Sequence, residues 1–297
     1  MNQNTMQDAQ ALLDARASDA QPSRRTALKA VVGVGFAASV LPVTAQTVVT
    51  TPGEGLLAGR ITIDVNGYAM PAYRSAPVGA SSAPVVLVVP EIFGVHEHIA
   101  DVTRRLAHLG YLAIAPDLMA RQGDASSFAD MGQLMAQVVS KVPDAQVMAD
   151  MDATLAWASR NGGDTARLAI TGFCWGGRIT WLYAAHQPQV KAAVAWYGRL
   201  VGQSTALTPL HPVDVVGQLH APVLGLYGGA DTGIPLETVE SMKAALAAGP
   251  VQARASQLVV YPDTPHAFHA DYRPSYRKDA AQDGWQRLTH WFRAHGV

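Results

Sequence analysis

The chain contains little cysteine and little charge. Cys174 is the single cysteine among 297 residues, which excludes an internal disulfide framework and a cysteine-based structural zinc site. Charged residues make up 15% of the chain, whereas an average globular protein has roughly 25%. The formal net charge is −1, and no basic block occurs outside the N-terminal region. The composition therefore gives no indication of a nucleic-acid partner.

The N-terminal region has the order of an export signal. A polar stretch ends in Ser23-Arg24-Arg25, an uncharged stretch follows, and Val43-Thr44-Ala45 resembles a cleavage site. The paired arginines resemble a twin-arginine signal, which predicts export to a bacterial periplasm by the twin-arginine machinery. The uncharged stretch, about 16 residues, is shorter than the roughly 20 that span a bilayer, and an uncleaved membrane anchor is the alternative. The predicted organisation is a signal segment at 1–45, a linker at 46–59 and a single domain at 60–297.

Short apolar runs alternate with amphipathic runs through the rest of the chain. The first two predicted strands flank Asn66-Gly67, the strongest short hairpin signal. Strands are predicted at 60–65, 68–74, 84–90, 111–115, 167–171, 190–196, 222–227 and 256–261. Helices are predicted at 96–109, 144–160, 179–185, 236–248 and 279–295. Hydrophobic residues, at 49%, supply a large core, and this alternation predicts an α/β fold with a mostly parallel sheet and helices on both faces.

One strand-to-helix turn carries the strongest functional signal. Gly172-Phe173-Cys174-Trp175-Gly176 is a Gly-x-Cys-x-Gly nucleophile elbow with cysteine in the serine position. Such a sharp turn holds its central residue in strained backbone geometry, and a Cβ atom at Gly172 or Gly176 would clash with neighbouring backbone. The turn presents the sulfur of Cys174 above the sheet, at a helix N-terminus whose N–H groups can face an oxyanion. The alternative is a buried, inert cysteine.

Two further residues follow Cys174 in the order typical of α/β-hydrolases. Asp231 comes after the next strand but one, and His266 comes after the last strand. Nucleophile, acid and histidine occur in this chain order, each past the carboxyl end of a strand. His266 would take the thiol proton while Asp231 accepts a hydrogen bond from the other imidazole nitrogen. The thiolate would attack an acyl carbon, and water would later hydrolyse the thioester.

The acid and the base each have competitors. Asp231 is preferred as the acid because it ends a glycine turn directly after a strand. His266 is preferred to His269 as the base because it follows Pro265 in a loop. Three other acidic residues remain alternatives for the acid: Asp214, Asp263 and Asp271.

The oxyanion hole requires two donors. The backbone N–H of Trp175 is the first candidate, and that of Ile92, after the 84–90 strand, is the second. Glu91 is unusual in that loop, because a carboxylate beside the thiol raises the thiol's pKa. It could instead accept the hydrogen bond of the resting thiol and move aside when substrate binds. The alternative is a solvent-facing glutamate.

Two other segments have less specific patterns. His96-Glu97-His98 resembles a set of metal ligands, but positions i and i+2 do not share a helix face, so a helix start without metal is predicted. The region 118–142 resembles an insertion with a helix over an apolar surface. A packing helix is preferred there to a mobile lid.

Together these segments resemble the dienelactone hydrolase family over residues 60–295. In that family the residues matching Cys174, Asp231 and His266 form the triad, and the glutamate matching Glu91 contacts the cysteine. The resemblance implies opening of the lactone ring of a carboxymethylenebutenolide, without a cofactor, by a monomer or weak homo-oligomer. The matching motifs are Pro90-Glu91-Ile92-Phe93-Gly94, Ala115-Pro116-Asp117-Leu118, Gly172-Phe173-Cys174-Trp175-Gly176-Gly177, Gly228-Gly229-Ala230-Asp231 and His266-Ala267-Phe268.

The chain also departs from the family pattern. Family enzymes have an arginine four residues past the catalytic histidine, which helps to hold the substrate carboxylate, and here that position is Ala270. Arg273 is the nearby substitute. A second family arginine would fall within 118–142, where Arg121 is the candidate. An export signal is also atypical of an intracellular catabolic step, so the resemblance implies the chemistry more firmly than the substrate.

Three functions fit these observations. The first is a cysteine hydrolase that acts on a small-molecule lactone or ester. The second is a thioesterase or another acyl hydrolase with the same triad, since specificity depends on loops. The third is a hydrolase-fold binding protein without catalysis, in which Cys174→Ala would leave ligand binding unchanged.

Overall fold

The computed structural model describes residues 50–297, so the predicted signal segment and most of the predicted linker lie outside the described residues. One sheet of eight strands runs through it in the order β1-β2-β4-β3-β5-β6-β7-β8. The six strands from β4 to β8 in that order are parallel, and β1 and β2 add an antiparallel edge. The predicted α/β fold with a mostly parallel sheet is therefore confirmed.

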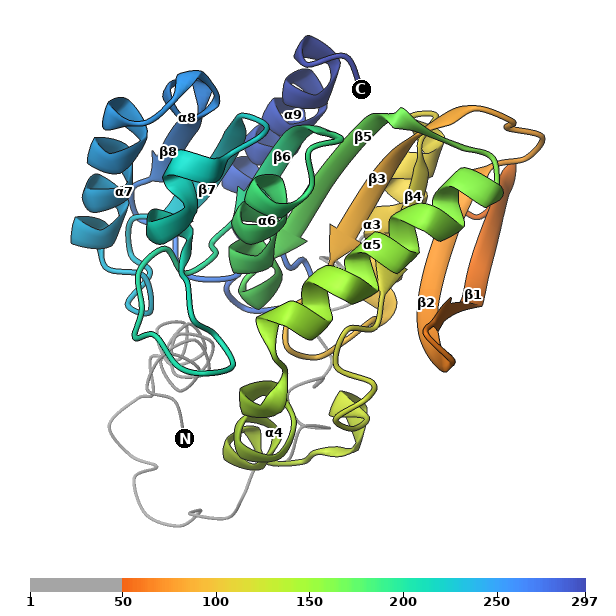
Figure 1. Ribbon diagram of the computed structural model, residues 1–297, viewed down its shortest axis with the longest axis horizontal. Helices are drawn as coiled ribbons and strands as arrows, with labels where there is room; N and C mark the ends of the chain where they lie inside the picture. The colour runs from red at the N-terminus through yellow and green to blue at the C-terminus, as the bar shows by residue number, and fades with distance from the viewer. Residues whose placement is uncertain (1–49) are drawn as a thin grey trace, which may run out of the picture.

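The elements agree with the alternation seen in the sequence. The strands are β1 (Leu56–Val65), β2 (Tyr68–Pro77), β3 (Ala83–Val89), β4 (Leu112–Pro116), β5 (Gly163–Phe173), β6 (Val190–Trp196), β7 (Val223–Gly228) and β8 (Gln257–Tyr261). The α-helices are α3 (Glu97–His108), α4 (Met131–Gln137), α5 (Asp144–Arg160), α6 (Trp175–His186), α7 (Leu236–Ala248), α8 (Val251–Ala255) and α9 (Lys278–Ala294). Helices α5, α6 and α7 lie in front of the sheet in Figure 1, and α3 and α9 lie behind it.

The predicted hairpin forms at the edge of the sheet. Its two turn residues have positive φ angles, 53° at Asn66 and 87° at Gly67, as a tight two-residue turn between antiparallel strands requires. Strand β1 begins at Leu56 rather than at 60, because residues 56–59 pair with 74–77 of β2. The C-terminal end of the predicted linker 46–59 is therefore strand.

The central strands are apolar because both faces of the sheet are covered. Val85, Leu87 and Val89 of β3 have no exposed surface, and the same is true of Ile170 in β5 and Val194 in β6. A strand buried on both faces needs apolar side chains at consecutive positions, which explains the uninterrupted runs in the sequence.

Several local features differ from the prediction. Strand β5 begins at Gly163 because Gly163 and Asp164 pair with the start of β3. Helix α8 and the 3-10 helix at Pro212–Gln218 were not predicted, since proline and glycine in these segments favour loops. In the region 118–142, Leu134, Met135 and Val138 are fully buried, which is the burial of a packing helix.

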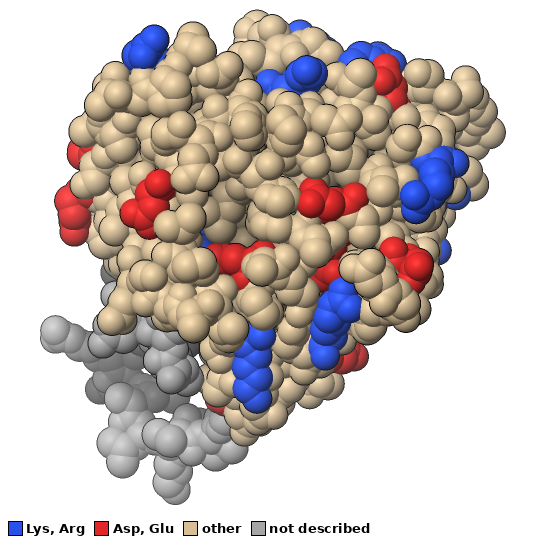
Figure 2. Space-filling view, in the orientation of Figure 1, with Lys and Arg blue, Asp and Glu red and all other residues tan. Residues whose placement is uncertain are grey.

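Charged side chains are scattered over the face shown in Figure 2, where the described residues form no broad patch of one sign. This agrees with the charged content of 15% and the net charge of −1. Within residues 50–297, no helix is both long and apolar enough to cross a membrane.

The turn between β5 and α6 is packed backbone to backbone. A Cβ atom on Gly172 would lie 2.3 Å from the carbonyl oxygen of Gly176, and one on Gly176 would lie 2.3 Å from the carbonyl oxygen of Val89. Carbon and oxygen cannot approach so closely without a backbone shift. The two glycines therefore bring the start of α6 against the end of β3.

We predict that Gly176→Ala lowers the free energy of unfolding by about 3 kcal/mol, because the methyl group must push β3 and α6 apart. Urea denaturation measures this value. Gly59→Ala is the matched control, since a Cβ there meets nothing within 4 Å, and its effect should stay within about 0.5 kcal/mol. Equal effects of the two substitutions would contradict the packing argument.

Candidate active site

Cys174 occupies the strained position that the elbow pattern predicts. It directly follows β5, caps the N-terminus of α6, and has φ 55° and ψ −116°. The strained backbone is held by hydrogen bonds on both sides. Its N–H donates to the carbonyl oxygen of Trp196 at 3.0 Å, and its carbonyl oxygen accepts from the N–H groups of Gly177 and Arg178. The side chain is buried, so the elbow fixes the sulfur at the carboxyl edge of the sheet.

The structure brings His266 and Asp231 together beside Cys174. The Nδ1 atom of His266 lies 2.6 Å from Oδ2 of Asp231, and both side chains are 1% exposed. The other carboxylate oxygen of Asp231 accepts from the N–H of Gly233 at 2.9 Å, which fixes the carboxylate. Burial alone lowers the pKa of His266, but the Asp231 carboxylate and the nearby Cys174 sulfur outweigh burial and raise it well above its usual value. The site therefore favours an imidazolium.

The competing residues have other partners. Asp271 lies 3.2 Å from Nδ1 of His98 and 2.7 Å from Nη2 of Arg105. The ring of His269 stacks on Phe173 rather than reaching Asp231. Asp214 and Asp263 are exposed, and Asp214 accepts the N–H of His211 at the start of the 3-10 helix.

The two predicted oxyanion donors, the backbone N–H groups of Trp175 and Ile92, lie in neighbouring segments. Trp175 is the first residue of α6, so its N–H has no acceptor within that helix. Ile92 is fully buried in the turn after β3, and the contact of Gly176 with Val89 and Pro90 brings that turn against α6. Among residues 50–297, neither N–H donates to a backbone carbonyl in a turn or loop.

Glu91 is buried at the site, so the solvent-facing alternative is wrong. Its Oε2 atom accepts from the phenol of Tyr272 at 2.9 Å and lies 3.3 Å from Nε2 of His96. Nη2 of Arg273 lies 3.9 Å from the same oxygen, and Nε of Arg273 donates to the Tyr272 phenol at 3.0 Å. Oε1 is buried and has no hydrogen-bond partner among the described residues.

These neighbours hold Glu91 in its ionised form. Burial raises the pKa of the carboxyl group, but the charge of Arg273 and the hydrogen bond from His96 more than offset burial and bring the pKa well below its ordinary value. Glu91 is thus a carboxylate in a cluster with the buried Arg273 and the partly buried His96 and Tyr272, which we call the Glu91 cluster.

The two predicted arginines lie in different places. Arg273 belongs to the Glu91 cluster and also packs over the ring of Phe93, at 4.8 Å from its centroid. Arg121 instead forms an ion pair with Asp150 and packs over the ring of Tyr68 at 3.9 Å. Arg273 therefore lies at the site, whereas Asp150 and Tyr68, the partners of Arg121, lie outside it.

Tyr197 and Tyr272 were not singled out from the sequence. Tyr197 has φ 38°, its ring meets that of His266 edge to face at 5.1 Å, and its buried hydroxyl has no partner in the described part of the chain. Its position directly after the 190–196 strand is a signal that could have identified it. The contact of Tyr272 with Glu91 spans 181 positions, and no spacing rule reveals it.

Comparison with known proteins identifies the family of this chain. The profile described as "Dienelactone hydrolase family" matches residues 70–296. A "Putative carboxymethylenebutenolidase" of Methylorubrum extorquens is 60% identical over 276 residues, which cover 93% of this chain and 94% of that protein. A protein of the same name from Salmonella typhimurium is 58% identical over 263 residues, with 88% and 96% covered.

Solved structures show the same likeness. A crystal structure titled "Putative Dienelactone Hydrolase", from Klebsiella pneumoniae, has a TM-score of 0.77 at 58% identity and covers 80% of this chain and 98% of that one. A "Dienelactone Hydrolase-like Promiscuous" enzyme from metagenomic libraries has a TM-score of 0.66 at 22% identity, covers 81% of this chain and 99% of that one, and shares the fold. The chain belongs to the dienelactone hydrolase family and is a hydrolase that acts on ester bonds.

Proposed function

We propose that the protein opens a lactone or ester through a Cys174-His266-Asp231 triad and an acyl-enzyme intermediate. The observation that carries this proposal is the buried imidazole of His266, whose Nδ1 lies 2.6 Å from the Asp231 carboxylate and whose pKa is raised by both Asp231 and the nearby Cys174. Such an arrangement favours transfer of the thiol proton to the imidazole and stabilises the imidazolium that results.

The reaction then has two stages. The Cys174 thiolate attacks the carbonyl carbon, and the imidazolium of His266 returns its proton to the departing oxygen as the ester bond breaks. In a lactone the alcohol and the acyl group are joined by the rest of the ring. Cleavage therefore leaves a single ring-opened molecule, bound to Cys174 as a thioester. The imidazole of His266 then takes a proton from a water molecule as the water oxygen attacks the thioester carbon. The imidazolium passes that proton to the sulfur of Cys174 as the acid is released.

Charge on the carbonyl oxygen is stabilised by the backbone donors of Ile92 and Trp175 in this proposal. Both belong to segments that the Gly176 contact holds together, so the donors are positioned before substrate arrives. The dipole of α6 adds a partial positive charge at the same place.

Glu91 has a modulating role in this proposal. An ionised carboxylate near the thiol opposes formation of the thiolate, and its ties to Tyr272, Arg273 and His96 limit that effect. Arg273 is the residue that we assign to substrate contact, because its guanidinium is buried at the site and can exchange Glu91 for a substrate acceptor.

We also propose, from the sequence alone, that the protein is exported. The basis is the pair Arg24 and Arg25 before an uncharged stretch. Residues 1–45 lie outside the described part of the structure. In this proposal the protein is a periplasmic enzyme, and a membrane-anchored form is the alternative. It acts as a monomer or weak homo-oligomer and requires no cofactor.

We predict that Cys174→Ala lowers kcat/KM for a dienelactone and a p-nitrophenyl ester by about 10³-fold or more, because the nucleophile is lost. Rapid mixing of the wild type with p-nitrophenyl acetate, followed by intact-protein mass measurement, should show a transient acetyl group on Cys174. Wild-type turnover that survives the substitution would rule out the cysteine mechanism. Turnover of thioesters alone would favour the thioesterase alternative.

The ionised state of Glu91 predicts a pH effect on stability. The folded pKa of Glu91 lies below the unfolded one, so its stabilising contribution is complete above the unfolded pKa, about 4.3, and is lost as the pH falls. Between about pH 5 and about pH 3, the wild type should lose up to about 2 kcal/mol more than Glu91→Gln. Urea denaturation of both proteins at each pH measures this difference. Parallel losses would contradict an ionised Glu91.

Arg273 and Arg121 provide a matched pair of charge removals. We expect Arg273→Gln to lower kcat/KM for an ester or lactone by about tenfold or more, because one charge-assisted contact at the site is lost. Arg121→Gln should change kcat/KM less than about threefold, because Arg121 is engaged with Asp150 and Tyr68. Steady-state kinetics on the two variants gives the comparison, and a larger effect at Arg121 would reverse the assignment.

A further inference from the structure

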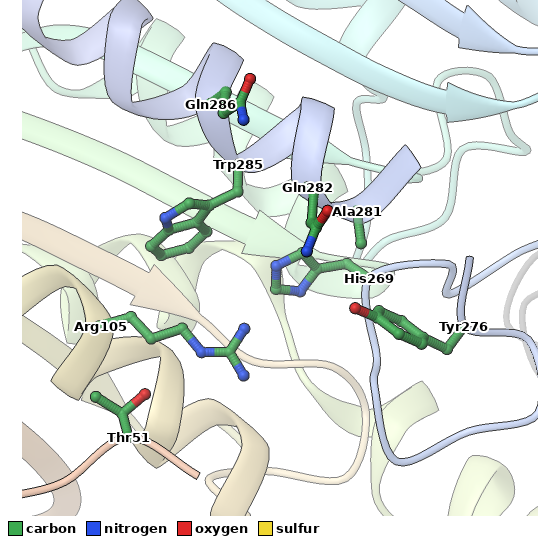
Figure 3. Close-up of a pocket in the computed structure, with 8 residues that line it drawn as sticks. All are labelled: Thr51, Arg105, His269, Tyr276, Ala281, Gln282, Trp285 and Gln286. Atoms are coloured by element: carbon green, nitrogen blue, oxygen red, sulfur yellow. The ribbon is translucent and has the colours of Figure 1, made fainter. Parts of the chain in front are cut away.

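A cavity away from the triad lies between α3, α9 and the segment that follows His266. Its volume is about 440 Å³, which falls within the size range of small-molecule sites. No residue of the triad or of the Glu91 cluster lines it. Figure 3 shows the residues that do line it, which are Thr51, Arg105, His269, Tyr276, Ala281, Gln282, Trp285 and Gln286.

His269 is a buried polar group without a partner in this cavity. The residue is 2% exposed, and its Nδ1 atom makes no hydrogen bond with residues 50–297. Its ring stacks on Trp285, with 5.9 Å between centroids, and Figure 3 places it among the other lining side chains. A buried nitrogen without a partner is costly. Because His269 lines the cavity, its imidazole is the polar group that a ligand there would hydrogen bond.

The cavity has no unbalanced charge among its lining residues. Arg105 donates from Nε to Asp101 at 2.5 Å and from Nη2 to Asp271 at 2.7 Å, so two carboxylates balance its charge. Burial, with smaller effects of the neighbouring His98 and Arg105, lowers the pKa of His269 well below its usual value and keeps the imidazole neutral. Arg105 is the only charged residue among the described residues that line the cavity. An anionic ligand that approached it would also be repelled by the carboxylates of Asp101 and Asp271.

The remaining lining groups suit a flat molecule. Trp285 is partly exposed on α9 and, with the Tyr276 ring, supplies aromatic surface. The exposed amides of Gln282 and Gln286 supply both donors and acceptors at the rim. Pockets of this composition bind through apolar contact and orient the ligand through a few hydrogen bonds.

We propose that this cavity is a second small-molecule site, which binds an uncharged planar aromatic compound that carries a hydrogen-bonding group such as an amide. The ring of the ligand lies against Trp285, and its polar group hydrogen bonds to the imidazole of His269. This site is independent of the ester-hydrolysing triad, although Phe173 stacks on His269 and directly precedes Cys174.

The test uses benzamide and benzoate, a neutral and an anionic compound of the same shape. Binding is followed by saturation-transfer NMR on the whole protein with Cys174 alkylated by iodoacetamide, which blocks the nucleophile. We expect benzamide to bind the alkylated protein. Benzoate should bind at least about tenfold more weakly, because the carboxylates of Asp101 and Asp271 repel its negative charge.

Substitutions assign the binding to the cavity. His269→Phe keeps an aromatic ring and removes both nitrogens, and it should weaken benzamide binding by about tenfold. His290→Phe, at an exposed position on the same helix as Trp285, is the matched control and should leave binding unchanged. Trp285→Leu provides a second variant, expected to weaken binding similarly, should His269→Phe fail to fold.

Four results would overturn the proposal. Absence of benzamide binding would show that the cavity does not take this class of compound. Benzoate binding as tight as benzamide binding would contradict the uncharged class. Binding that is abolished by alkylation of Cys174, or unchanged in both His269→Phe and Trp285→Leu, would place the ligand elsewhere.

Discussion

The contact between the start of α6 and the end of β3 is the constraint on which the rest of the site depends. Gly176 allows the carbonyl oxygens of Val89 and Pro90 to approach the elbow to distances that no side chain permits. That approach brings the turn with Glu91 and Ile92 next to Cys174. Without it, Cys174, Ile92 and Glu91 would belong to separate parts of the sheet edge.

Electrostatic balance is the second requirement of the site. Asp231 and Glu91 are both buried carboxylates near one sulfur, and each has its own cationic or hydrogen-bonding partners. Asp231 faces His266, which favours the imidazolium, whereas Glu91 faces Arg273 and Tyr272. In the proposed mechanism, this division lets Asp231 support the thiolate while the opposing effect of Glu91 is limited.

Much of the fold could be predicted from the sequence because buried parallel strands and their covering helices differ in length and periodicity. The prediction matched both ends of β6, α5 and α7. The elbow was predictable because Gly172 and Gly176 leave a local signature. The Glu91–Tyr272 contact was not, since it depends on how segments 181 positions apart meet. The cavity at His269 was equally hidden, because it depends on the packing of α3 and α9.

The central claim is that Cys174 and His266 form a reactive pair, and the pH dependence of Cys174 alkylation tests it most directly. The rate of iodoacetamide labelling should remain high well below the ordinary thiol pKa of about 8.5 in the wild type. In His266→Gln, labelling should slow at neutral pH, because the thiolate loses its counter-ion. Equal rates in the two proteins, with the pH dependence of an ordinary thiol, would contradict the account.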